Sequence, residues 1–211
     1  MGLRLVRVRE THIEQIRRWR TSEDVTKYMY TDPRIGPEDQ HRWFDGIVQD
    51  RSRMDWVISL EGSDVGVVSL YDIVPCCGRC SLARYLGEES ARGRGTGTAV
   101  VLNILHYVFE CLNLHRVHME AFEWNDAAVK ANLKFGARIE GTLRDHVWKN
   151  GRYHNVVCQG LLREDWENNV RHKMAYRPAE IEEWEEKARL VSLALPSSGE
   201  CISTGEWSNP P

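Results

Sequence analysis

The sequence predicts an α/β (α+β) fold: a mixed, mostly antiparallel sheet of about seven strands flanked by helices. First, short apolar runs with period-two alternation are interleaved with stretches of helical periodicity. Second, the turns 61–64 and 149–152 each join two such runs, as in a hairpin. Third, a strand, a glycine-rich loop, a helix and another strand follow one another, which predicts a crossover between parallel strands.

Composition limits the class of protein. The chain has 211 residues, 42% of them hydrophobic, and a net charge of -3, which fits one globular domain with a core. The basic residues are scattered, which argues against a nucleic-acid partner, and no apolar run approaches the roughly 20 residues that span a bilayer. Charges fall where a signal peptide needs an apolar stretch, so we expect a cytoplasmic protein with neither nucleic acid nor membrane as partner.

The chain order predicts one main domain over 1–168, a helical extension over 169–195, and a tail over 196–211 with the composition of a disordered end. In the amino-terminal part, a strand over 3–9 precedes a helix that Thr11 is expected to cap. The remaining expected elements are a helix over 37–50 opened by Pro37, strands over 55–60, 65–74 and 81–87, a core helix over 96–111, a strand over 115–124, a short helix capped by Asn125 and Asp126 and ended by Gly136, two strands within 138–162, and a last amphipathic helix over 179–195.

The chain has six cysteines, and we predict no metal site among them. Cys111 and Cys158 lie in apolar surroundings and are expected to be buried thiols. Cys76, Cys77 and Cys80 cluster in a turn. A zinc or redox site there remains the alternative, although no second pair of ligands follows at a matching spacing.

The segment 92–98, RGRGTGT, combines cations and glycines at the mouth of the core helix. The first amides of a helix have no intrahelical acceptor, and they carry the positive end of the helix dipole. Glycines at 93, 95 and 97 would let a bulky anion approach the backbone closely. The segment therefore predicts a phosphate-binding loop, with an ordinary turn as the alternative.

The loop and its surroundings resemble the GNAT N-acetyltransferase superfamily, which binds the pyrophosphate of acetyl-coenzyme A with the pattern R-x-x-G-x-G. Arg92, Gly95 and Gly97 stand at its fixed positions, between an antiparallel strand and a core helix. The segment 119–137 resembles the family's second signature, in which an Asn opens a short helix that ends in K-x-G. The resemblance covers roughly residues 3 to 162 in order.

This resemblance implies a GNAT fold with a sheet splayed at its centre, and acetyl-CoA as co-substrate. The pantetheine arm would pair with the backbone of about 84–86 in the gap of the sheet. The residues that the resemblance assigns to coenzyme binding are Arg84, Tyr85, Leu86, Arg92, Gly93, Arg94, Gly95, Thr96, Gly97, Thr98, Asn125, Asn132 and Lys134.

Amine acetylation depends mainly on a base, because an alkyl amine is protonated at neutral pH while a thiolate leaves readily. Glu120 matches a carboxylate position that some amino-sugar acetyltransferases of the superfamily use as base. His118 is the reserve candidate, since it lies on the same face of the strand. Where many members carry an acidic Tyr, this chain has Asn132, which cannot donate a proton to the leaving sulfur.

The chain looks like the RimJ/RimL-type branch, and within it the segment 140–157 resembles the PseH-like acetyltransferases of nucleotide-linked amino sugars. We therefore expect a small-molecule amine acceptor. A protein amino-terminal acetyltransferase and a non-catalytic acyl-CoA binder remain the alternatives, and a homodimer stays open. An acceptor wall of mixed aromatic and polar character, otherwise simply core, is expected from Trp19, Arg20, Tyr28, Met29 and Trp43.

Overall fold

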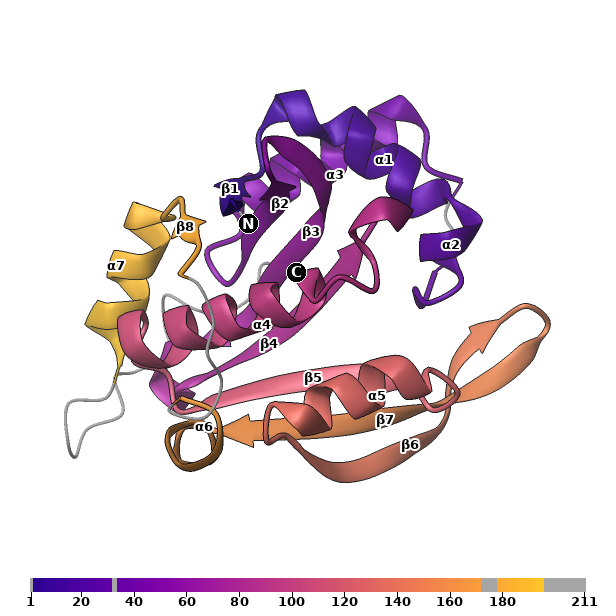
Figure 1. Ribbon diagram of the computed structural model, residues 1–211. Coiled ribbons are helices and arrows are strands. Elements are labelled where there is room, and N and C mark those ends of the chain that lie inside the picture. The colour runs from indigo at the N-terminus through magenta and orange to yellow at the C-terminus, as the bar shows by residue number, and fades with distance from the viewer. Residues whose placement is uncertain (1, 32–33, 172–177, 196–211) are drawn as a thin grey trace.

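The computed structural model describes residues 2–31, 34–171 and 178–195, and it has the predicted architecture of a mixed sheet flanked by helices (Figure 1). The sheet has eight strands in the order β6-β7-β5-β4-β3-β2-β1-β8. The elements in chain order are β1 (Leu3–Arg7), α1 (Ile13–Thr21), α2 (Glu23–Thr26), α3 (Pro37–Gln49), β2 (Met54–Leu60), β3 (Ser63–Val74), β4 (Arg79–Leu86), α4 (Thr96–His106), β5 (Arg116–Phe122), α5 (Asp126–Lys134), β6 (Arg138–Lys149), β7 (Arg152–Leu162), α6 (Arg163–Asn169), β8 (Glu180–Ile181) and α7 (Glu185–Ala194).

The strands β1 to β4 form an antiparallel meander, as the hairpin signals predict. Helices α1 and α3 cover one face of this half-sheet with a core that includes Ile16, Ile47 and Val67. The predicted cap at Thr11 is wrong: Thr11 lies inside a short 3-10 turn, Glu10–His12, and α1 begins after it. The helix predicted to begin at Pro37 is confirmed. Proline is tolerated at this first position because the N–H that it lacks would have no intrahelical acceptor there.

Strands β4 and β5 run parallel but stay together only briefly. Their register covers Arg79 with Arg116, Cys80 with Val117, and Ser81 with His118. Beyond that point β4 continues along β3 to Leu86 and β5 continues along β7, so the two strands diverge. Figure 1 shows this divergence between β4 and β5. The splayed sheet implied by the resemblance is therefore present, and it divides the sheet into two half-sheets.

Helix α4 packs its apolar residues against the opposite face of the sheet and begins at the glycine-rich loop. The predicted helix 96–111 changes to a π turn at Tyr107–Cys111, which ends it. Helix α5 begins after Asn125, whose side chain accepts a hydrogen bond from the Ala128 amide, and Gly136 follows it with a φ of +86°. Both ends of α5 are as predicted.

The carboxy-terminal segment departs from the predicted single helix over 179–195. Its first residues form β8, which pairs in parallel with β1, and only α7 is helical. Trp184 and Val191 belong to the same core as α4, and Lys187 donates to the carbonyls of Ile47 and Arg53 at 2.8 Å. Residues 178–195 thus share the main core, while the division of the chain at 168 and 169 stays a prediction. The predicted tail over 196–211 lies outside the described residues.

The cysteines differ in burial from the expectation. Cys111 is exposed and Cys158 is half-buried, so the prediction that both are buried thiols is wrong. Cys80 is the buried thiol, and burial raises its pKa to about 12.

Among the described residues, none of the helices has the length and apolar character that a membrane span requires.

Gly87 follows β4 and allows α1 to pack on the end of that strand. A Cβ at Gly87 would lie 2.2 Å from Cγ of Trp19. We expect Gly87→Ala to lower the free energy of unfolding by about 1–3 kcal/mol, because either the indole or the strand must move. Urea denaturation measures the change.

The matched control is Gly46→Ala in the exposed interior of α3, where a Cβ would meet nothing within 4 Å. Alanine there should stabilise the protein by about 0.5–1 kcal/mol. Equal stability of the two variants would contradict the packing described.

Candidate active site

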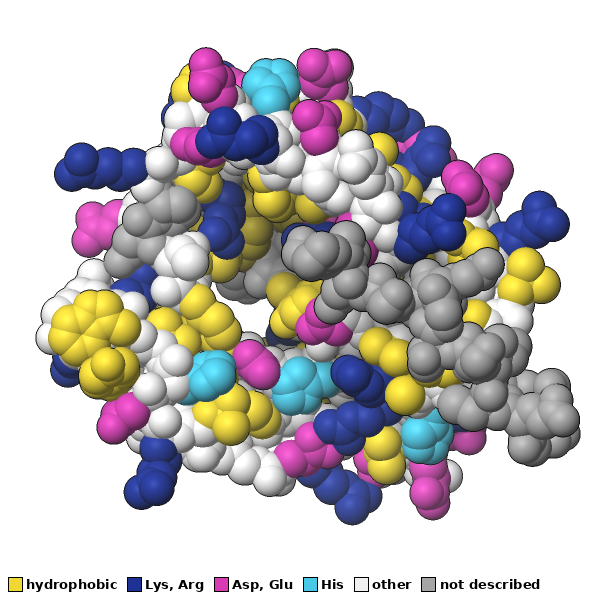
Figure 2. All heavy atoms as spheres, turned by 180° about the vertical axis from the view of Figure 1, so that it is seen from behind, with side chains coloured by type: hydrophobic (Ala, Val, Ile, Leu, Met, Phe, Trp, Pro, Cys, Tyr) yellow, Lys and Arg dark blue, Asp and Glu magenta, His cyan; other side chains and the backbone are white. Residues whose placement is uncertain are grey.

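A cavity of about 1150 Å³ opens where β4 and β5 diverge. Its lining comes from both half-sheets, from the helices α1, α3, α4 and α5, and from the loop that precedes α4. Figure 2 shows the molecule hollowed near the middle of its rear face, with histidine and acidic side chains along one margin. Binding pockets for single small ligands measure roughly 300–1,000 Å³, so this cavity has room for a coenzyme arm together with an acceptor.

The glycine-rich loop lies at the mouth of α4, with Gly93, Gly95, Gly97 and Thr98 among the lining residues. Gly93 and Gly95 have φ values of +71° and +81°, which L side chains rarely adopt. A Cβ at any of the three glycines would meet nothing within 4 Å. The space beside the loop is therefore open, and the first amides of α4 can donate into it.

The other predicted loop residues have different positions. Arg92 lines the cavity, donates to the carbonyl of Leu86 at 3.0 Å, and forms an ion pair with Asp24 at 3.4 Å. It therefore joins the end of β4 to α2. Arg94 is exposed. Thr96 is buried and lies outside the lining, and its hydroxyl has no hydrogen-bond partner among the described residues.

A chain of hydrogen bonds beside the cavity links β4 to α5 and β7. Arg84 donates to Oδ1 of Asn132 at 2.8 Å, and Nδ2 of Asn132 donates to Oε1 of Gln159 at 2.9 Å. Gln159 in turn donates to the carbonyl of Val129 at 3.1 Å. Burial lowers the pKa of Arg84 to about 10, so the guanidinium stays charged at neutral pH.

Three further residues of the predicted coenzyme set also line the cavity. Tyr85 and Leu86 line the cavity at the free end of β4, as does Asn125 at the start of α5. Lys134 is exposed at the end of α5 and lies outside the lining. Lys134 is thus not brought to the cavity with the others.

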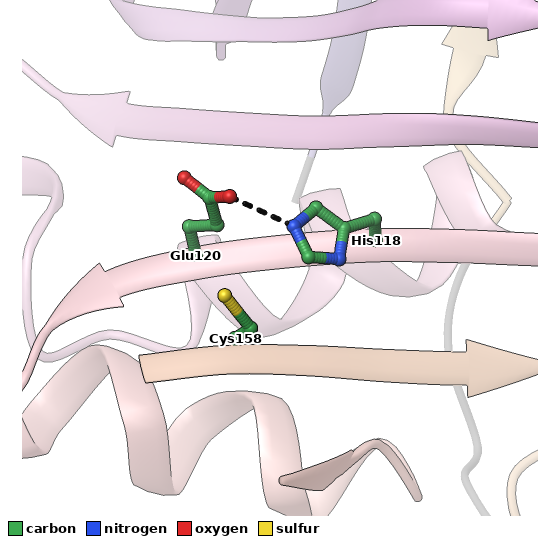
Figure 3. Close-up of side chains that lie close together, drawn as sticks. All are labelled: His118, Glu120 and Cys158. Carbon is green, nitrogen blue, oxygen red and sulfur yellow. Dashed lines mark hydrogen bonds and ion pairs between the residues drawn. The ribbon is translucent and has the colours of Figure 1, made fainter. Parts of the chain in front are cut away.

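Glu120 projects from β5 into the cavity and is held by two donors. His118 Nε2 lies 2.9 Å from Oε1 of Glu120, and the Tyr30 hydroxyl donates to Oε2 at 3.0 Å. The hydrogen bond from His118 is the largest cause that holds the pKa of Glu120 below its ordinary value. Glu120 is therefore ionised at neutral pH, and His118 and Glu120 lie on the same face of β5 (Figure 3).

Tyr30 is a site residue that the sequence analysis missed. It follows α2 in a turn, packs edge-on against Phe122 with ring centroids 5.2 Å apart, and reaches Glu120 across the gap of the sheet. Burial and the nearby Glu120 charge raise the pKa of Tyr30, which keeps its hydroxyl protonated as a donor. No periodicity or motif marks this position in the sequence.

The same part of the site includes the donors that could hold a metal ion. Ligand atoms of His118, Glu120 and Cys158 lie within 4.8 Å of one another (Figure 3). Imidazole, carboxylate and thiolate are zinc ligands. Burial, with the charges of Glu120 and Glu140, raises the pKa of the Cys158 thiol, so without a metal this sulfur keeps its proton.

The opposite wall holds four of the five residues predicted for the acceptor: Arg20, Tyr28, Met29 and Trp43 line the cavity. Tyr28 stacks on Trp124 at 5.7 Å between centroids. Trp19 is 4% exposed, donates its indole N–H to Glu88 at 2.7 Å, and lies outside the lining. The prediction that Trp19 belongs to the acceptor wall is therefore wrong, and Trp19 lies in the core beneath this wall.

Residues 2–138 match the family model described as "Acetyltransferase (GNAT) domain". The chain belongs to the GNAT acetyltransferase family. Its members are acetyltransferases with acetyl-CoA as co-substrate, and membership in the family supports the predicted enzyme class and co-substrate.

Among curated relatives, the chain is similar to YdaF of Bacillus subtilis, provisionally a ribosomal N-acetyltransferase, with 30% identity over 51% of this chain and 58% of that protein. It is also similar to the spermidine N(1)-acetyltransferase of Vibrio cholerae, with 22% identity over 70% of this chain and 85% of that protein. The chain thus spans less than two thirds of the length of YdaF.

Among solved structures, the fold matches a spermidine N-acetyltransferase from Vibrio cholerae in complex with CoA and spermine. The TM-score is 0.74 at 20% identity, over 79% of this chain and 99% of that one. The GNAT fold is therefore confirmed, whereas the RimJ/RimL-type branch and the PseH-like subgroup stay predictions.

Gly97 tests the loop without disturbing its backbone, because its φ is an ordinary one and the space around its Cβ is open. We expect Gly97→Val to weaken acetyl-CoA binding at least about tenfold, since the side chain would occupy the space beside the first amides of α4. Calorimetric titration with acetyl-CoA measures the affinity, and thermal unfolding verifies the fold.

Gly141→Val on the exposed strand β6 is the control, since a Cβ there also meets nothing within 4 Å. This variant should bind acetyl-CoA as the unaltered protein does. Unchanged affinity in a folded Gly97→Val protein would refute the assignment of the loop.

Proposed function

We propose that this protein transfers the acetyl group of acetyl-CoA to the primary amine of a small molecule, an amino sugar in free or nucleotide-linked form. One observation carries the proposal: an ionised carboxylate, Glu120, faces a cavity at the divergence of β4 and β5, opposite an open glycine-rich loop. The loop and the carboxylate are the two parts that amine acetylation from a pyrophosphate-bearing coenzyme requires.

In this proposal the coenzyme lies along the side formed by the loop, β4 and α5. Its pyrophosphate meets the first amides of α4, and its pantetheine arm follows the edge of β4 that β5 leaves free. Backbone amides at this edge would polarise the thioester carbonyl and stabilise the developing oxyanion. The acceptor enters from the side of α1, α3 and Tyr30.

Glu120 acts as the base of the transfer. An alkyl amine has a pKa near 10.4, so its neutral form costs roughly 4–5 kcal/mol to populate at pH 7. The amine nitrogen bonds to the thioester carbonyl carbon, Glu120 takes the proton directly or through one water, and the carbon–sulfur bond breaks with the electron pair on sulfur. His118 and Tyr30 orient the carboxylate for this step.

Asn132 takes a different part from the Tyr of many family members. Asn132 cannot protonate the leaving thiolate. The conjugate thiol has a pKa near 8.5, however, so the thiolate is a good leaving group at neutral pH. The Arg84 guanidinium, hydrogen-bonded to Asn132, supplies positive charge on the same side. Thiolate release would then be assisted by electrostatic stabilisation rather than by an acid.

Two other activities have support from relatives. The similarity to YdaF favours a protein amino terminus as acceptor, and the similarity to spermidine acetyltransferases favours a polyamine. A non-catalytic acyl-CoA binder is the third alternative. Thiol release measured with amino sugars, amino-terminal peptides, spermidine and no acceptor separates all four, because each predicts release with a different member of the panel or with none.

We expect Glu120→Gln to lower kcat by about 10² to 10⁴ while acetyl-CoA affinity barely changes, because the amide keeps the shape of the side chain but removes its basicity. Asn132→Ala should cost much less, since only hydrogen bonds near a good leaving group are lost. Steady-state kinetics and coenzyme titration measure both quantities.

The pH profile gives a second readout. Because the pKa of Glu120 lies below its ordinary 4.5, the base is ionised throughout the neutral range, and kcat/KM should rise with pH as the free amine loses its proton. Loss of activity on acidification through the pKa of Glu120 should be absent in Glu120→Gln. Glu123→Gln, at an exposed position directly after β5, should behave as the unaltered enzyme. Normal turnover in Glu120→Gln with a crippled His118→Ala would reassign the base.

A further inference from the structure

Two buried polar groups of the cavity lining have no hydrogen-bond partner in the described part of the chain: Nε2 of Gln40 and the hydroxyl of Tyr85. Gln40 is 3% exposed, and the hydroxyl of Tyr85 is likewise a buried atom. Almost all buried donors in proteins have a hydrogen-bond partner, and a donor left without one lowers the stability of the fold. Both groups are therefore suited to a ligand that supplies acceptor atoms.

A third donor, Arg20, lines the same cavity with little to hold its charge. The side chain makes one long hydrogen bond, 3.4 Å to the Thr31 hydroxyl, and no ion pair with any described carboxylate. Burial lowers its pKa, with the nearby Arg53 adding to the effect and the Tyr85 hydroxyl opposing it. The groups that act on the pKa of this guanidinium are thus a second cation and a phenol, and no carboxylate is among them.

These three donors belong to one wall. Arg20 extends from α1, Gln40 from α3 and Tyr85 from β4, and both helices pack with Tyr85 on the same face of the sheet. This is the face opposite α4, so the wall lies on the acceptor side of the cavity.

The carboxylates of the lining leave nothing for Arg20. Asp24 pairs with Lys27 and Arg92, and Asp39 pairs with Arg42. Arg53 itself is neutralised by Asp55, which receives hydrogen bonds at 2.7 and 2.9 Å.

Glu120 has His118 and Tyr30 as its donors. Each described carboxylate that lines the cavity is thus engaged, and the unbalanced charge on the acceptor side is positive.

We propose that Arg20, Gln40 and Tyr85 form an anion subsite that binds a phosphate or carboxylate group of the acceptor. The inference rests on the proposed function and makes it narrower: the acceptor carries a primary amine for Glu120 and a negatively charged group for this wall. Arginine offers a fork of N–H donors that matches the oxygens of either anion. A polyamine is disfavoured, because its second cation would lie beside an unpaired guanidinium.

The test compares acceptors that differ by one anionic group. Acetylation kinetics are measured with glucosamine, glucosamine 6-phosphate, muramic acid and spermidine. We expect kcat/KM for an anionic amine to exceed that for glucosamine at least about tenfold, with spermidine the poorest. The comparison of glucosamine 6-phosphate with muramic acid shows whether the wall prefers a phosphate or a carboxylate.

Arg20→Met should remove this preference by raising KM for the anionic acceptor about 10- to 100-fold, so that the variant no longer favours the anionic acceptor over glucosamine. Arg18→Met on the same helix is the control, because Arg18 is exposed and, among the residues that the structure describes, forms an ion pair with Glu14 alone. An undiminished preference in folded Arg20→Met would overturn the subsite, as would equal rates with glucosamine and both anionic amines.

Tyr85→Phe and Gln40→Leu separate binding from folding. Since both remove a buried group without a partner, thermal unfolding should occur at an equal or higher temperature while KM for the anionic acceptor rises. A fall in melting temperature together with an unchanged KM would show structural roles instead and would count against the proposal.

Failure of the proposed function can be distinguished from failure of the anion subsite. If no acceptor releases thiol, the proposed function fails, and calorimetric titration of glucosamine 6-phosphate into the unaltered protein and Arg20→Met decides the subsite by binding alone. Binding that depends on Arg20 supports it, and absent or Arg20-independent binding refutes it.

Discussion

The short parallel pairing of β4 with β5 is the constraint on which the rest of the structure depends. It ends at Ser81 and His118, and from there each strand remains paired on its outer side only. Backbone groups along the inner edges then lack strand partners, and such edges favour the addition of an extended ligand. Two half-sheets that diverge in this way need separate support, because no ladder of hydrogen bonds holds them together beyond the shared end.

That support comes from helices on each side and from side chains that cross the gap, among them Arg84 and Tyr30. The first half-sheet has α1 and α3 on one face, whereas Phe122, Val147 and Val156 form a small cluster of their own at the far end of the second. Tyr30 packs on this small cluster from the amino-terminal half and donates to Glu120. One of the contacts that brace the gap is therefore also a contact that orients the proposed base.

The fold could be predicted because its signals are local in the sequence. The site could be predicted only in part, because it depends on contacts between distant segments. The loop at 92–98, the Asn125 cap and the turn at 149–152 are all encoded within a few residues, and each is found where the sequence indicates. Tyr30 reaches Glu120 across 90 positions of sequence, and no local pattern can report such a pairing. β8 has two residues, too few for a period to appear, and its pairing with β1 depends on the tertiary fold. Trp19 shows the limit of a helical face, since periodicity says that a residue is buried but not whether it lines a cavity or lies beneath its wall.

Asn132 has a structural reason to differ from the acid of many family members. Its amide accepts from Arg84 and donates to Gln159 with two separate atoms, and this bridge ties β4 to β7 across α5. A phenol would carry its donor and acceptor functions on a single oxygen further from the helix, so it could not make the same two bonds in place. With Arg84 held by this bridge, a fixed positive charge lies beside the coenzyme side of the cavity, and its pKa of about 10 keeps it charged at neutral pH. A fixed cation would stabilise a departing thiolate without giving up a proton, and this suits a leaving group whose conjugate thiol has a pKa of only about 8.5. In the proposed mechanism the positive charge of Arg84 takes the place of a proton donor, and Glu120 is the group that accepts a proton.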